Sequence, residues 1–370
     1  MSLAVLLNDY TLQNVVMGAL LLGAISGVLG SFAVLRKQSL LGDALSHAAL
    51  PGVCLGFIIA GSREMGSIMA GALGSGAGAA LMVLLLTRYS RLKTDAALGI
   101  VLSTSFALGV VLLTFIQSMN NASQGGLDSF LFGQAAATLR SDLVVMAAVT
   151  ALALTLVALL WKEFKLVCFD PGFARALGMP VLLLEVILTV MIALAVVVGL
   201  QMVGVVLMAA MVIAPAVAAR QWSPRLEVMV PLSAAFGMAA GVCGALVSTL
   251  GRGLATGPLI IISVSVFVIA SLMLAPRRGL LWEAVSRLRR RLRHQQLLTT
   301  LHRLALAHGD SHFRSEQGLL DGYHGTHTRS AMKRLAQRGL VARHERYWML
   351  TDAGHEEAAN ILARMEGRVT

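Results

Sequence analysis

The stretch "SLLGDALSHAALPGVCLGFIIA", residues 39–60, sets an aspartate and a histidine inside a run of small and apolar residues. As a helix, a run of this length crosses the ~30 Å hydrocarbon core of a bilayer. Asp43 and His47 are four residues apart, so they share one face of that helix. The other eight histidines of the chain all follow Arg293. The stretch is therefore interpreted as a membrane helix that carries one polar pair.

The composition extends this interpretation to most of the chain. Of the 370 residues, 57% are apolar and 13% are charged, and the mean hydropathy is +0.77. Ordinary soluble domains carry about a quarter charged residues. We therefore predict an all-α polytopic membrane protein with about eight or nine transmembrane helices, in apolar runs at about 11–35, 39–60, 65–87, 94–117, 141–161, 181–198, 200–219, 228–250 and 256–275. The pair within 181–219 is the least distinct, because only Gly199 and Gln201 separate its halves.

The loop charges favour one orientation across the membrane. With the N-terminus outside, the outer loops hold Arg63, Arg140 and Arg252. The inner loops then hold Arg36, Lys37, Arg88, Arg91, Lys93, Lys162, Lys165, Arg175, Arg220 and Arg225. Because cytoplasmic loops carry the excess of Lys and Arg, this orientation is preferred and the C-terminal tail is expected in the cytoplasm.

Charge also divides the chain into domains. Residues 1–276 hold 13 Lys and Arg against 10 Asp and Glu, and residues 277–370 hold 17 against 9. The break falls near Ala275–Gly279. We predict a membrane domain over residues 1–279, a basic linker over 280–293 and a small cytoplasmic α+β domain over 294–370.

Asp43 and His47 are the first candidates for chemistry. A carboxylate and an imidazole side by side suit Mn²⁺, Fe²⁺ or Zn²⁺. Two ligands hold an ion weakly, which suits an ion that must also leave, and a facing subunit would double their number. The alternative is a neutral packing pair. The cost of ionisable groups in a membrane favours a functional role, and Glu185 is the other acid well inside an apolar run.

The segment "CFDPGFARALGMP", Cys168–Pro180, is framed as a short helix between two spans. Asp170 is a good N-cap, Pro171 suits the first turn, and Gly178 and Pro180 end the helix. Phe173, Ala174 and Leu177 form an apolar stripe, with Arg175 to one side. We favour a docking surface for a partner over a helix that lies on lipid. The chain has no G-x-x-x-x-G-K-[ST] phosphate loop, so we do not expect it to hydrolyse ATP itself.

Several segments, spread over roughly residues 10–280, together resemble the permease family of ABC importers for zinc, manganese or iron. They are "RKQSLLGDALSHAALPGVCLGF" (36–57), "LFGQ" (131–134), "FDPGFARALGMP" (169–180), "GVVLMAAMVIAPAVAA" (204–219) and "TGPLIIISVSVFVIASLMLAPRRGL" (256–280).

The resemblance implies a multi-pass permease of the bacterial cytoplasmic (inner) membrane that imports Mn²⁺, Zn²⁺ or Fe²⁺ and holds no permanent cofactor. Its implied partners are a second permease subunit, in a homo- or heterodimer, two separate ATPase subunits and an extracytoplasmic metal-binding protein. The family's metal-gating pair falls on Asp43 and His47. Its ATPase-coupling helix falls on the segment that contains Asp170, Phe173, Ala174, Arg175, Leu177 and Gly178.

The tail departs from most of that family. "THTRSAMKRLAQRGLV" (326–341) predicts a helix that runs into a strand, and residues 343–365 predict a strand, a turn and a final helix. This order is similar to the winged-helix, DNA-binding half of metal-dependent manganese or iron repressors. Phosphate or partner contacts would come from Arg329, Lys333, Arg334 and Arg338. The four histidines His324, His327, His344 and His355 are interpreted as surface residues.

A winged helix does not fix a function. The dimerisation half and the metal-ligand set of such repressors are absent from the sequence, so a regulatory or subunit-contacting module is favoured over a nucleic-acid binder. Two alternatives to the importer permease stay open: a membrane-tethered, metal-responsive transcription regulator, and a proton-driven secondary metal carrier.

Overall fold

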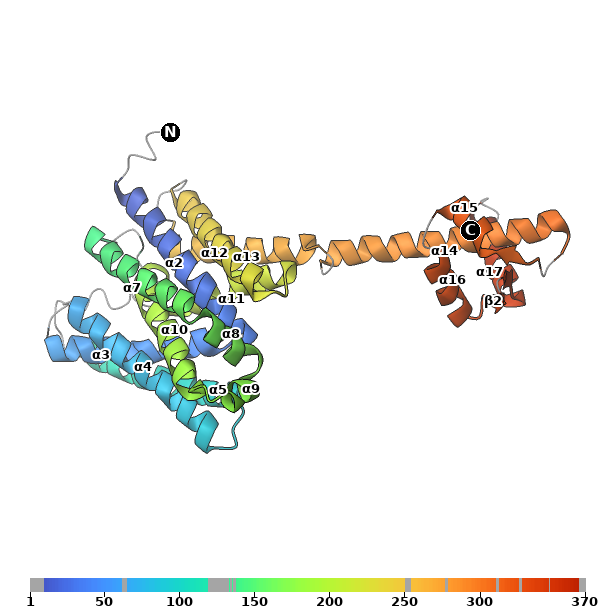
Figure 1. Cartoon of the computed structure of the whole chain (residues 1–370). Coiled ribbons are helices and arrows are strands. Elements are labelled where there is room, and N and C mark those ends of the chain that lie inside the picture. Colours follow the sequence, from blue (N-terminus) through green and yellow to red (C-terminus); the bar gives the residue numbers. More distant parts are fainter. Residues whose placement is uncertain are drawn as a thin grey trace. The chain divides into compact units, whose positions relative to one another are not determined.

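The structure is a computed structural model, and it describes residues 10–61, 65–118, 133, 135, 138–249, 254–276, 279–310, 313–325, 328–345 and 347–365. The chain divides into two compact units, Met1–Gly279 and Leu280–Thr370. Within the described part of the first unit, nine helices are long and apolar enough to span a membrane (Figure 1). The predicted fold class, a polytopic helical membrane protein with a small α+β unit, is confirmed.

The membrane helices are α2 (Tyr10–Leu35), α3 (Leu41–Ala60), α4 (Met65–Tyr89), α5 (Thr94–Ser118), α7 (Arg140–Leu159), α10 (Val181–Val203), α11 (Val205–Trp222), α12 (Leu226–Ser248) and α13 (Thr256–Leu274). Two short helices, α8 (Trp161–Phe169) and α9 (Pro171–Ala176), connect α7 to α10. Most of the connection between α5 and α7 lies outside the described residues.

The break between α10 and α11 differs from the predicted one. Helix α10 continues through Gly199 and ends at Val203, and the chain turns at Gly204, whose φ is +89°. Glycine adopts a positive φ without the steric penalty that a side chain brings. Gly199 serves packing instead, because a Cβ there would come within 2.5 Å of the Met208 sulfur. Hydropathy alone did not distinguish these two glycines.

Helix α2 lies at the centre of the membrane unit and packs most extensively against α12. A Cβ at Gly23 would come within 2.4 Å of the Gly237 carbonyl carbon, so the two backbones touch where both residues are glycine. Ser233 of α12 also donates a hydrogen bond to the Gly27 carbonyl at 2.8 Å. Small residues that let backbones approach closely, together with interhelical hydrogen bonds, hold membrane helices together.

The apolar surface is arranged for lipid. Helices α5, α7 and α13 bury about a fifth of their most apolar windows, 22% in each case. Large side chains such as Val111, Val144 and Ile262 are exposed on them. A water-soluble protein rarely leaves so extended an apolar surface uncovered, so the exposed apolar faces of these three helices suit a membrane protein.

The C-terminal unit begins with the long helix α14 (Leu280–His308), which includes the predicted linker. It continues through β1 (Ser315–Glu316), α15 (Gln317–His324), α16 (Thr328–Gln337), β2 (Val341–His344), β3 (Tyr347–Leu350) and α17 (Asp352–Met365). The strands form an antiparallel sheet in the order β1-β3-β2. The helix-to-strand and strand-to-helix order predicted for residues 326–365 is the order observed.

This unit has a hydrophobic core of its own. Leu298 and Leu301 of α14 pack with Met332, Trp348 and Ile361. The indole nitrogen of Trp348 donates to the Gln317 side-chain oxygen at 2.8 Å, which satisfies the one polar atom of a buried ring. The core face of α14 begins at Leu297, because apolar residues of its first half, such as Leu281 and Leu288, are exposed.

Candidate functional site

Asp43 and His47 lie in the first two turns of α3 on one face. The Nε2 atom of His47 is 3.4 Å from Oδ1 of Asp43. The His47 side chain is 18% exposed and that of Asp43 is 35% exposed. The pair is thus held in apolar surroundings, while the carboxylate still reaches an accessible surface.

His47 has one ring nitrogen that the described chain does not satisfy. Its Nδ1 atom is buried and has no hydrogen-bond partner. The ring packs edge-on against Phe106, with centroids 4.9 Å apart, and that contact holds its orientation. A buried polar atom without a partner costs about 1–3 kcal/mol. The ring therefore has a fixed orientation, with Nε2 facing Asp43 and Nδ1 without a partner among the described residues. This arrangement suits a residue that binds a transient ligand.

One chain does not supply a full metal site. Among the described residues, no group of three or more His, Cys, Asp or Glu side chains is placed to hold an ion. The predicted pair is brought together, and it supplies two donors. Tight transition-metal sites in proteins use about four ligands. Any ion held here therefore needs donors from water or from another chain.

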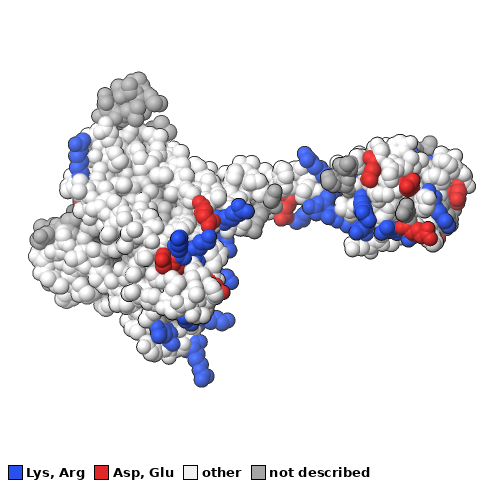
Figure 2. Space-filling view, viewed as in Figure 1, with Lys and Arg blue, Asp and Glu red and all other residues white. Residues whose placement is uncertain are grey.

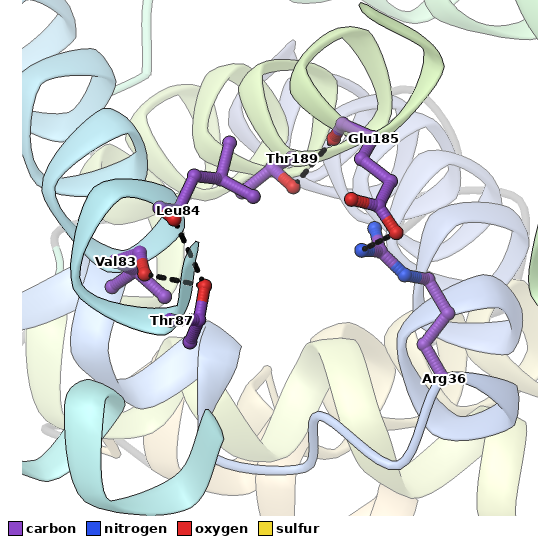
Figure 3. A network of polar contacts seen from close by, with 6 residues as sticks. All are labelled: Arg36, Val83, Leu84, Thr87, Glu185 and Thr189. Carbon is purple, nitrogen blue, oxygen red and sulfur yellow. Dashed lines mark hydrogen bonds and ion pairs between the residues drawn. The ribbon is translucent and has the colours of Figure 1, made fainter. Parts of the chain in front are cut away.

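A second ionisable pair, which the sequence did not reveal, links α2 to α10. Arg36, in the turn that follows α2, places Nη2 3.4 Å from Oε1 of Glu185 (Figure 3). The Arg36 side chain is 9% exposed, and its Nη1 atom is buried without a hydrogen-bond partner. Glu185 was noted as an acid within an apolar run, and such an acid needs a counter-charge. From the sequence, Arg36 was assigned to an inner loop, and in the structure this residue supplies the positive charge that faces Glu185.

Glu185 also lines a cleft of about 390 Å³ beside this pair. Thr87 and Arg88 from the end of α4 and Arg175 from α9 line the same cleft. Figure 3 shows Glu185 and Arg36 on one side of an opening and Thr87 across from them. The cleft therefore brings together residues from α4, α9 and α10 next to the ion pair that reaches the turn before α3.

Helix α9 has the predicted caps. The Oδ1 atom of Asp170 accepts a hydrogen bond from the Phe173 backbone N–H at 2.9 Å, and Pro171 occupies the first turn. At the other end Gly178 has φ +77° and donates its N–H to the Arg175 carbonyl at 2.9 Å. These contacts fix the helix within the α8–α10 connection, even though it is only six residues long.

The side chains of α9 divide into a buried anchor and an exposed apolar pair. Ala174 is fully buried, which seats the helix on the unit. Phe173 and Leu177 are 54% and 59% exposed, and they lie four residues apart on the same side. The predicted stripe of Phe173, Ala174 and Leu177 is thus two outward-facing residues and one inward-facing residue. The outward pair, next to Arg175, is a small apolar knob.

The four basic residues predicted on α16 do not form one stripe. Arg329 and Lys333 lie on the face of α16 opposite its buried residues Ala331 and Leu335. Arg334 and Arg338 instead line a groove shared with α14. The helical pattern predicted basic residues on a helix, but it did not show that α14 divides them between two surfaces.

Two of the predicted surface histidines make contacts. The Nδ1 atoms of His302 and His355 are 3.0 Å apart, and Nε2 of His324 is 2.9 Å from the Thr300 hydroxyl. His344 is exposed as predicted, and His327 lies outside the described residues. Burial, followed by the nearby His355, lowers the pKa of His302. Burial, followed by Arg293, lowers the pKa of His324.

Comparison with known proteins places the membrane unit in a family. Residues 8–275 match the ABC 3 transport family, and this range covers the nine spans. The chain belongs to the ABC 3 transport family. It is therefore an integral membrane transport protein, as its nine apolar helices indicate.

Individual ABC 3 relatives agree with the family match. The chain is 48% identical over 292 residues, 78% of this chain and 67% of the relative, to "Manganese transport system membrane protein MntC" of Bacillus subtilis (strain 168). It is 45% identical over 278 residues, 75% of this chain and 93% of the relative, to "Zinc transport system membrane protein TroC" of Treponema pallidum (strain Nichols).

A solved structure shares both sequence and fold. The structure "PsaBC from Streptococcus pneumoniae in complex with Fab" is 34% identical and superposes with a TM-score of 0.65 over 74% of this chain and 95% of that chain. The range matched by the family, residues 8–275, contains Asp43, His47, Glu185 and α9. The candidate residues thus lie within an ABC 3 membrane unit.

Proposed function

We propose that this chain is the membrane-spanning permease subunit of an ATP-driven importer of Mn²⁺, Zn²⁺ or Fe²⁺ in a bacterial inner membrane. The names of its relatives, which are manganese and zinc transport system membrane proteins, support metal as the cargo. The observation that carries the proposal is the His47–Asp43 pair, with a buried ring nitrogen that has no hydrogen-bond partner among the described residues. A carboxylate and an imidazole with spare donors suit these ions.

The incomplete ligand set supports a paired assembly. A second permease, either another copy or a related chain, brings its own acid and imidazole to face Asp43 and His47. Four donors then surround the ion briefly, and each subunit alone binds it weakly. Weak, shared coordination allows both entry and release, which a translocation site requires.

Helix α9 is the proposed contact with separate ATPase subunits. The exposed pair Phe173 and Leu177 offers an apolar knob, and buried Ala174 transmits its movement to the unit. This chain is then a translocation subunit, and ATP hydrolysis belongs to its partners. An extracytoplasmic binding protein delivers the ion on the other side of the membrane.

The Arg36–Glu185 pair gives a route from α9 to the metal pair. Helix α10 follows α9, and Glu185 lies in its second turn. Its partner Arg36 lies in the turn that leads into α3, a few residues before Asp43. Displacement of α9 by the ATPases therefore pulls on the start of α3, and separation of the facing α3 helices opens the gate.

The C-terminal unit is proposed to lie in the cytoplasm as a winged-helix-like module that contacts a subunit or a regulator. The excess of inner-loop Lys and Arg supports this side of the membrane. The order of helices, two-stranded wing and third strand supports the winged-helix comparison. The competing hypothesis, a tethered transcription regulator, requires specific duplex binding by this unit.

Co-purification tests the proposed function. The protein is isolated from its native membrane with its associated subunits, reconstituted, and assayed for ATP hydrolysis with and without Mn²⁺, Zn²⁺ or Fe²⁺. We expect an ATPase subunit to co-purify and one of these ions to stimulate hydrolysis. Metal uptake that continues without any ATPase subunit, driven by a proton gradient, would support the secondary-carrier alternative instead.

A further inference from the structure

The C-terminal unit contains a basic groove that the proposed transport function does not use. It lies between α14, α16 and α17 and has a volume of about 560 Å³. Five arginines line it: Arg287, Arg290 and Arg291 from α14, Arg334 from α16 and Arg338 from the turn directly after α16. All of these residues belong to one compact unit with its own core, so the groove is formed by that unit alone.

The positive charge of the groove is only partly compensated. Glu357 is the one acidic side chain among its described lining residues. Arg287 is engaged by Glu283 of its own helix, Nη2 to Oε2 at 2.8 Å. Within the described part of the chain, Arg290, Arg291, Arg334 and Arg338 form no ion pair with a carboxylate. Like charges gathered in a concave site repel one another, so a polyanion that enters it is stabilised.

His294, which also lines the groove, reports the same electrostatic environment. Burial is the largest cause that lowers its pKa, and the charges of Arg338 and Arg334 lower it further. The two guanidinium groups therefore act on the interior of the groove and not only on the surrounding water. Figure 2 shows Lys and Arg side chains crowded along the α14 part of this unit.

The shape of the groove favours a compact ligand over a nucleic-acid duplex. Sites of a few hundred Å³ take small molecules or headgroups. Duplex readers instead present a helix outward into the major groove. The outward residues of α16 are Arg329 and Lys333, and they do not line this groove. Arginine binds phosphate through paired N–H groups, and four unpaired arginines provide for at least two phosphates.

We propose that this groove binds a compact ligand that carries two or more phosphate groups, either a soluble oligophosphate or the headgroup of a diphosphate-bearing anionic phospholipid such as cardiolipin. The position of α14 in the sequence supports the phospholipid headgroup as the ligand. Helix α14 begins at Leu280, shortly after α13 ends at Leu274, and basic clusters directly beyond a membrane helix bind anionic lipid.

Two substitution pairs in α16 and the turn directly after it test the proposal with equal change of charge. Arg334→Gln with Arg338→Gln removes two charges from the groove. Arg329→Gln with Lys333→Gln removes two from the opposite face of α16. The full-length proteins, in phosphatidylcholine nanodiscs, are titrated with inorganic tripolyphosphate by calorimetry at fixed ionic strength. We expect the groove variant to bind at least ~10-fold more weakly and the control variant to bind like the wild type, within about twofold.

A second arm identifies the source of the phosphate. Native mass spectrometry of detergent-purified protein, with added cardiolipin or phosphatidylcholine, counts the lipids that each variant retains. Loss of one retained cardiolipin in the groove variant alone assigns a lipid ligand, and tripolyphosphate binding without that loss assigns a soluble one. Should Arg334→Gln with Arg338→Gln unfold the unit, the exposed pair Arg290→Gln with Arg291→Gln replaces it.

Three outcomes would overturn the proposal. In the first, the wild-type protein binds neither tripolyphosphate nor cardiolipin. In the second, both substitution pairs weaken binding equally, which would mean diffuse attraction with no site. In the third, duplex DNA binds more tightly than either probe and depends on Arg329 and Lys333. Metal uptake measured in parallel keeps this result separate from the transport proposal, because ligand binding at the groove does not require a working transporter.

Discussion

A few ionisable side chains within the apolar unit carry most of the proposed chemistry. Asp43 and His47 were predicted from their residue types, their apolar surroundings and their spacing, because four residues bring them to one helical face. The structure adds what spacing does not contain, namely the 3.4 Å contact and the unsatisfied Nδ1 atom of the ring. Residue type and spacing thus predicted the pair, whereas the edge-on contact of the ring with Phe106 is a feature of the folded unit that spacing does not predict.

Removing either partner of the Arg36–Glu185 pair should destabilise the membrane unit. Glu185→Leu leaves a charged Arg36 that is 9% exposed and uncompensated, and we expect a loss of about 3 kcal/mol. Adding Arg36→Met should restore much of this stability, because an apolar pair replaces a nearly buried ionic one. Thermal unfolding of the two variants in detergent measures the difference. A double variant less stable than Glu185→Leu alone would argue against the pair.

The same pair should matter for transport beyond stability. If Arg36 and Glu185 connect α9 to α3, the charge-reversed double variant Arg36→Glu with Glu185→Arg keeps the attraction, while each single reversal produces repulsion. We expect both single variants to lose most ion uptake and the double variant to recover part of it. Uptake of radiolabelled Mn²⁺ by cells that produce equal amounts of each protein is the measurement. If the double variant loses as much ion uptake as the single variants, the proposed connection between α9 and α3 through Arg36 and Glu185 is excluded.

At the level of elements, α9 offers the sharpest functional test. More than half of the Phe173 and Leu177 side chains is exposed, whereas Ala174 is fully buried. Bulk at Ala174 would therefore disturb the fold and give no information about docking. Phe173→Ser with Leu177→Ser should leave the permease stable but reduce co-purification of the ATPase by ~10-fold or more. Leu306→Ser, at a leucine that is 67% exposed in the C-terminal unit, is the control. Undiminished ATPase recovery with the α9 variant would refute the docking role.

The contact between α2 and α12 depends on glycine. A Cβ at Gly23 meets the Gly237 backbone at 2.4 Å, whereas a Cβ at Gly74 in α4 meets nothing within 4 Å. Gly23→Ala should thus destabilise the unit by about 1–3 kcal/mol through overpacking, and Gly74→Ala should be neutral or slightly stabilising. Melting curves of the purified proteins compare the two. Identical melting temperatures for the two variants would contradict the prediction that a methyl group at Gly23 disturbs the packing of α2 against α12.

Helix boundaries were predicted well where composition changes and poorly where it does not. The spans over residues 10–35 and 94–118 follow apolar runs with polar ends, so hydropathy located them. The break between α10 and α11 lies inside one continuous apolar run. It is set by the positive φ of Gly204, which hydropathy does not register. The division of basic residues on α16 depended on the position of α14, a contact between helices distant in sequence.

At the scale of the whole molecule, the chain combines a lipid-facing unit and a basic α+β unit. Composition predicted both, because low charge and a high apolar content require a membrane while the tail carries 17 Lys and Arg against 9 acids. It did not predict that the expected linker over residues 280–293 forms one helix with the start of the second unit. A run of arginines is compatible with a solvated helix as well as with a coil.

The C-terminal unit should lose stability in mild acid. The folded structure lowers the pKa of His294, His302 and His324, chiefly by burial. Above the unfolded-state pKa of about 6.5 these rings are neutral in both states, and there the stabilisation is complete. As the pH falls through that value the unfolded chain binds protons first, so the free energy of unfolding decreases.

Thermal melting of residues 280–370 between pH 7.5 and 5.5 tests this titration. We expect the melting temperature to fall as the pH is lowered. His302→Gln should reduce the slope, because it removes one titrating ring and the close contact with His355. A melting temperature that rises as the pH falls would contradict the direction of these shifts.

The central proposed role is that of His47 as a transient ligand for a divalent ion at the gate between facing subunits. Uptake of radiolabelled Mn²⁺ and Zn²⁺ by cells that carry His47→Ala, beside the control His344→Ala and at matched protein levels, tests this most directly. We predict that His47→Ala lowers uptake by ~10-fold or more while His344→Ala transports normally. Normal uptake by His47→Ala would contradict the assignment of the site.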